Sequence, residues 1–118
     1  MRRAQDAQKG KMMKIPNSVR IGGVEYTVKR EMNLNDGTNM LYGRVDWEPS
    51  EILLKYGMGQ QHSGVTLWHE IVHAMLYHGC AELDEETEER VAEVLGLGIY
   101  QVLEDNHDRF YAEGGRKA

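Results

Sequence analysis

The chain has 118 residues, of which 41% are hydrophobic and 28% charged, a composition typical of a single globular domain. Its formal net charge is −5, which excludes a general nucleic-acid-binding protein, because such a protein needs a basic surface. The one cysteine, Cys80, cannot form an intramolecular disulfide and favours a reducing compartment. No apolar run suits a membrane span or a signal peptide, so we expect a cytoplasmic protein without membrane contact.

The two ends of the chain differ from the middle in their pattern. Residues 1–14 hold five basic residues and one acid with almost no apolar periodicity, which predicts a disordered basic tail. Residues 15–106 carry the regular apolar patterns and are expected to form a single domain. We assign 107–118 to a C-terminal tail.

Four β-strands are expected in the first half of the domain. Apolar residues alternate with polar ones from Ser18, which predicts a β-hairpin at about 18–30 with Gly22-Gly23 as its turn. Residues 41–47 make a third strand and residues 51–56 a fourth.

The second half of the domain has helical periodicity. Beyond Gly64, apolar residues recur at spacings of three and four, which predicts an amphipathic helix that ends at Gly79. A second helix is expected from Asp84 to about Asp105, with an acid-rich first turn. Its predicted apolar residues are Val91, Leu95, Ile99, Val102 and Leu103. Strands followed by two helices predict an α+β fold, in which a small antiparallel sheet of three to four strands packs against two antiparallel helices.

The first helix carries the segment H-E-I-V-H at residues 69–73. His69 and His73 lie one turn apart on the same helix face, so that their imidazoles can bind one zinc ion. Glu70 is rotated by about 100° from His69. It can therefore take a proton from a zinc-bound water without binding the metal itself. The segment predicts a zinc site in which Glu70 is the catalytic base.

A catalytic zinc ion needs a third protein ligand, and the second helix offers several glutamates. If the helices are antiparallel, acids one to three turns into the second helix reach the level of the histidines. We favour Glu89, because with Ala92 and Gly96 it forms a stripe along which the two backbones can approach closely. Glu88 and Glu93 remain alternatives.

Two segments resemble small HExxH proteins of phage and prophage origin, which are similar to the ImmA/IrrE type of minimal zinc metallopeptidase. They are T-L-W-H-E-I-V-H-A-M-L (66–76) and E-E-R-V-A-E-V-L-G-L-G-I-Y-Q-V-L-E-D-N (88–106), within a similarity that covers roughly residues 40–106. The E-x-x-A pattern of that group is matched by Glu89 and Ala92. The resemblance implies a small sheet, a motif helix, and a second helix with a glutamate ligand. It also implies a bacterial host cell and a phage or prophage gene.

Carried over by position, the resemblance implies His69 and His73 as ligands, Glu70 as base and Glu89 as third ligand. We therefore expect a zinc endopeptidase that hydrolyses a protein or peptide substrate through a zinc-bound water activated by Glu70. An extended substrate would pair with an edge strand, for which residues 51–56 are the candidate. The alternative is a phage accessory or interaction protein with a structural or vestigial zinc site and no proteolytic activity.

Overall fold

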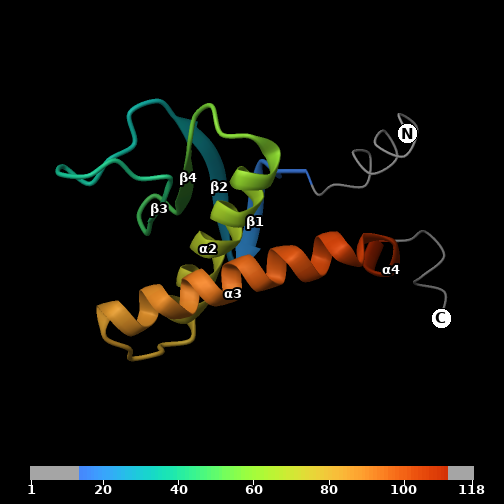
Figure 1. The fold of residues 1–118 in the computed structure, drawn as a ribbon. Coiled ribbons are helices and arrows are strands. Elements are labelled where there is room, and N and C mark those ends of the chain that lie inside the picture. Colours follow the sequence, from blue (N-terminus) through green and yellow to red (C-terminus); the bar gives the residue numbers. More distant parts are fainter. Residues whose placement is uncertain (1–13, 112–118) are drawn as a thin grey trace.

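The computed structural model describes residues 14–111, so the predicted basic tail lies outside this range except for Lys14. The elements in chain order are β1 (Ser18–Ile21), β2 (Val24–Glu31), β3 (Gly43–Asp46), β4 (Glu51–Lys55), α2 (Gln60–His78), α3 (Glu85–Asp105) and α4 (His107–Tyr111). The predicted α+β class is confirmed. Figure 1 shows α2 between the sheet and α3, and α4 continues from the end of α3. Residues 107–111, which we had assigned to a C-terminal tail, thus form a short helix.

The predicted hairpin at 18–30 is confirmed as β1 and β2. The two strands pair in antiparallel register, with Ile21 opposite Val24. Gly22 and Gly23 form the two-residue turn with φ angles of +60° and +81°. Positive φ is accessible to glycine without a steric penalty, which is why this dipeptide stands between two strands.

The hairpin turn also touches the C-terminal end of α2. A Cβ atom at Gly22 would lie 2.5 Å from Cγ of His78, whereas one at Gly23 would have open space. We expect Gly22→Ala to lower the free energy of unfolding by roughly 2–4 kcal/mol, from left-handed strain and overpacking together. Gly23→Ala should cost only about 1–2 kcal/mol, from strain alone. Equal destabilisation of the two variants in chemical denaturation would contradict this contact.

The sheet is mixed, so the prediction of a purely antiparallel sheet is wrong. The strand order is β1-β2-β4-β3. β4 pairs parallel with β2 and antiparallel with β3. The β3–β4 hairpin docks with β4 on the inside, where Ile52, Leu53 and Leu54 are all buried. A continuous apolar run of this kind is typical of a strand that is covered on both faces.

The strand order also corrects the expected edge. Residues 51–56 were the candidate for pairing with a substrate, but β4 is bonded to a strand on each side. The edges of the sheet are β1 and β3. An extended peptide that adds to the sheet must therefore pair with β1 or β3.

The hydrophobic core lies between the sheet and α2. Its buried members are Ile21, Tyr26, Ile52, Leu54, Leu67, Ile71 and Ala74. α2 begins at Gln60, several residues before the predicted start, and Gly59 occupies the N-cap position. Its predicted end is confirmed, with Gly79 as C-cap. Within residues 14–111 none of the helices combines the length and apolarity needed to span a membrane.

α3 packs chiefly on α2, and α2 provides most of the helical cover of the sheet. The predicted start of α3 is confirmed, because the Asp84 carboxylate caps this helix by accepting a hydrogen bond from the Thr87 backbone N–H at 2.7 Å. The predicted apolar face is wrong in part: Leu95 and Val102 are 47% and 52% exposed. The buried residues of α3 are instead Ala92, Gly96 and Tyr100.

Close approach of the two helices explains why small residues face the interface. A Cβ atom at Gly96 would lie 2.8 Å from Cα of His69, and one at Gly64 would lie 2.3 Å from the Tyr100 ring. Larger side chains at these points would hold the helices apart. Gly64 lies beside Tyr100 and His69, later in α2, lies beside Gly96, so the helices run in opposite directions along their contact, as predicted.

Candidate metal centre

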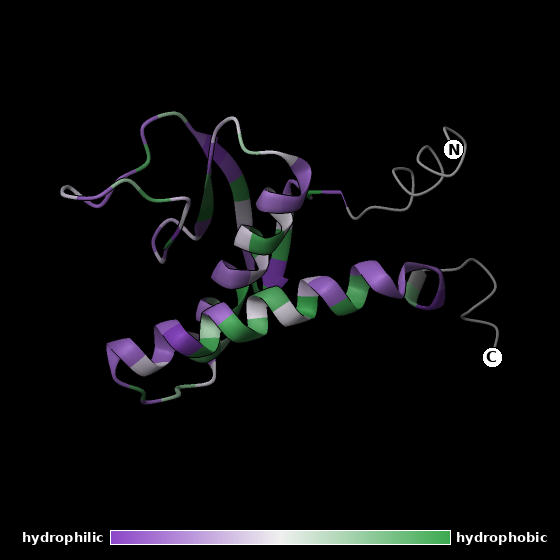
Figure 2. Ribbon diagram, viewed as in Figure 1, coloured by the Kyte–Doolittle hydropathy of each residue, from purple (hydrophilic) through white to green (hydrophobic). Residues whose placement is uncertain are grey.

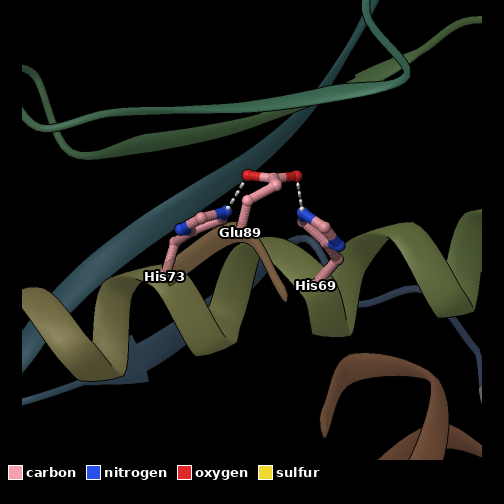
Figure 3. A group of neighbouring side chains, drawn as sticks. All are labelled: His69, His73 and Glu89. Carbon is pink, nitrogen blue, oxygen red and sulfur yellow. Dashed lines mark hydrogen bonds and ion pairs between the residues drawn. The ribbon is translucent and has the colours of Figure 1, made fainter. Parts of the chain in front are cut away.

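α2 and α3 bring three side chains together at their crossing, as Figure 3 shows. Nε2 of His69 lies 3.0 Å from Oε2 of Glu89, and Nε2 of His73 lies 3.2 Å from the other oxygen, Oε1. One ligand atom from each residue lies within 4.8 Å of the other two. The structure therefore brings the three residues predicted as ligands into one group that could hold a metal ion.

The local sequence accounts for this convergence. His69 and His73 are separated by one turn, so both imidazoles project from the same side of α2. Gly96 lies directly against the backbone of His69, which fixes the level at which α3 crosses. Glu89 is about two turns earlier on the same side of α3, and its carboxylate reaches both rings.

The two alternative glutamates have different positions. Glu88 accepts a hydrogen bond from Nδ1–H of His73 at 2.7 Å, on the ring nitrogen that does not face Glu89. Glu93 is exposed and lies outside the metal-binding group found within residues 14–111. Of the three candidates, Glu89 is the one whose carboxylate spans both histidines.

Glu70 is buried on the side of α2 that faces the sheet, with 8% of its surface exposed. Burial raises the pKa of its carboxyl group to about 7, the nearby His73 partly offsets this rise, and the charge of Glu89 adds to it. A carboxyl group with this pKa can both accept and release a proton near neutral pH.

Sequence reasoning missed the role of Gly43, the first residue of β3. A Cβ atom there would lie 2.7 Å from Cγ2 of Thr66 and 3.1 Å from Oε2 of Glu70. The edge strand therefore passes directly beside the buried carboxylate. Gly43 lies inside the strand predicted at 41–47, and a glycine inside a strand is a signal of close approach by other atoms.

The chain matches no protein-family model, no curated protein and no solved structure. Fold and site together define it as an α+β protein with a group of two histidines and one glutamate on two crossing helices.

Proposed function

We propose that this protein is a zinc-dependent endopeptidase. The proposal is carried by the convergence of two imidazoles and the Glu89 carboxylate within 4.8 Å. The buried carboxyl group of Glu70 is close enough to interact electrostatically with His73 and Glu89. Nitrogen and carboxylate donors suit zinc, and catalytic zinc sites combine three protein ligands with one open position. The donor set of His69, His73 and Glu89 fits that description.

The residues of the site have two separate roles in hydrolysis, namely binding of the metal and transfer of protons. A zinc ion held by these three side chains would supply Lewis-acid activation of water and of the scissile carbonyl. Glu70 takes the proton of the attacking water and passes it to the leaving amine. Burial of Glu70 against Gly43 of β3 holds its side chain in place for both transfers.

The edge strand β3 supports a peptide as the substrate. Its first residue, Gly43, lies against Glu70, so a chain paired with the free edge of β3 would pass close to the catalytic base. Main-chain hydrogen bonds of this kind bind extended peptides with little dependence on their sequence. We infer that the substrate is a protein segment that binds in an extended conformation.

Removal of metal tests this function. We expect the purified protein to cleave members of a mixed peptide library, with products identified by mass spectrometry. A zinc chelator should abolish cleavage, and addition of one equivalent of zinc should restore it. Cleavage that persists in excess chelator would overturn the proposal. Bound zinc without any cleavage would support the accessory-protein alternative instead.

A further inference from the structure

Glu88 lies outside the metal-binding group of His69, His73 and Glu89, yet its carboxylate accepts a hydrogen bond from His73 at 2.7 Å. We propose that Glu88 is a positioning residue that directs Nε2 of His73 toward the metal. This inference rests on the proposed zinc site. Glu88 and Glu89 are neighbours in α3, and each carboxylate addresses a different nitrogen of the same imidazole ring.

Two carboxylates compete for the proton of the His73 ring: Glu88 lies 2.7 Å from Nδ1 and Glu89 lies 3.2 Å from Nε2, so the shorter contact favours a proton on Nδ1. Nδ1–H of His73 donates to Glu88 at 2.7 Å, and the His73 and Glu88 side chains are 18% and 32% exposed. A neutral imidazole has one N–H group, so a proton held on Nδ1 leaves the lone pair of Nε2 free to bind a metal. Such carboxylate partners orient metal-binding histidines and raise their basicity. With its proton on Nδ1, His73 has the free lone pair of Nε2 directed toward Glu89, the proposed third ligand.

Zinc affinity distinguishes positioning from ligation. In chelator competition, Glu88→Ala should weaken zinc binding by roughly 10–100-fold. Glu88→Gln should lower the zinc affinity less, because the glutamine amide oxygen can still accept the hydrogen bond from Nδ1–H of His73. Glu93→Ala removes a carboxylate of the same helix and should bind zinc like the wild type. Unchanged affinity of Glu88→Ala would overturn the proposal, and a loss as large as that of Glu89→Ala would make Glu88 a ligand.

The tautomer can be measured without metal, which separates this inference from the proposed function. Nitrogen chemical shifts of neutral His73 in the metal-free protein should show the proton on Nδ1 in the wild type. In Glu88→Ala the proton should move toward Nε2. A proton that stays on Nδ1 in this variant would contradict the positioning role. If the wild type binds no zinc, the proposed peptidase function is excluded, but the position of the His73 proton still tests whether Glu88 orients the ring.

A second inference comes from the outer face of α3, which we define as Val94, Leu95, Gly98 and Val102. Figure 2 shows hydrophobic residues along the middle of α3. Val94, Leu95 and Val102 are 60%, 47% and 52% exposed, so residues 14–111 leave about half of each side chain uncovered. A continuous apolar surface of this kind marks an interaction site. We infer that this face pairs with the same face of a second copy.

Charge complementarity favours a second copy as the partner. Asp105 lies about two turns after Gly98 and is rotated from it by only about 20°, and Arg90 lies about two turns before Gly98, rotated by about 80° toward the edge of this face. Neither makes an ion pair with another residue between 14 and 111. A twofold axis at Gly98 with nearly antiparallel helices would place each Arg90 near the Asp105 of the other copy. A Cβ at Gly98 would meet nothing within 4 Å, which leaves room for a partner helix.

Sedimentation equilibrium tests this dimer. We expect the wild type to dimerise and Val94→Glu to weaken dimerisation at least tenfold. Met32→Glu, at an exposed position in the loop after β2, is the matched control and should leave it unchanged. Arg90→Glu and Asp105→Arg should each weaken the dimer, and the double variant should recover it. A monomeric wild type at submillimolar concentration, or a double variant that recovers nothing, would overturn the inference.

Discussion

Glu70→Gln is expected to abolish peptide hydrolysis while it leaves zinc affinity unchanged. The amide cannot accept the proton of the attacking water, and loss of a positioned general base lowers kcat by about 10²–10⁴-fold. Glutamine has nearly the volume of glutamate, so the close packing against Gly43 should be retained. Glu70 lies outside the group formed by His69, His73 and Glu89, so the ligands are untouched.

Two readouts make this prediction specific. Initial rates of peptide cleavage measure the catalytic step, and chelator competition on the same preparation measures zinc binding. Glu93→Gln is the matched control, because it makes the same chemical change at an exposed glutamate outside the site. Hydrolysis by Glu70→Gln at the wild-type rate would exclude Glu70 as the base.

Gly96→Ala should damage both the fold and the metal site. The new methyl group would lie 2.8 Å from the backbone of His69, so α3 must move away from α2. Overpacking of this kind lowers the free energy of unfolding by roughly 1–3 kcal/mol. Because Glu89 moves with α3 while both histidines stay on α2, we also expect zinc affinity to fall at least tenfold.

Gly98→Ala is the control for the Gly96 substitution. It makes the same change one half-turn further along α3, where a Cβ atom would meet nothing within 4 Å. Alanine favours helix over glycine, so this variant should be more stable by roughly 0.5–1 kcal/mol. Denaturation is compared at protein concentrations too low for subunit association. Wild-type stability and zinc affinity in Gly96→Ala would contradict the close helix contact.

The local features of the site were predictable because helical periodicity is local. The spacing of His69 and His73 places both on one helix face whatever the rest of the chain does. The stripe of Ala92 and Gly96 predicted that α3 approaches α2 closely along this side, and the structure buries both residues there. The choice between Glu88 and Glu89 depends on how α3 is rotated at the crossing, which the sequence alone leaves open.

The features that were mispredicted depend on contacts between distant segments. β4 lies beside β2 because the β3–β4 hairpin docks as a unit, and no local pattern states which of its strands is inside. Leu95 and Val102 were expected to be buried because they are large and apolar. The interface with α2 instead takes the smallest residues of α3, since only these allow the backbones to approach.

Zinc content is the most direct test of the central claim, that His69, His73 and Glu89 hold a catalytic zinc ion. The purified wild type should bind one zinc ion per chain at neutral pH, measured by elemental analysis after dialysis. His69→Ala should lose this zinc, because removal of one imidazole leaves only two of the three protein ligands. A wild type that binds no zinc, or a His69→Ala variant that retains a full equivalent, would contradict the assigned site.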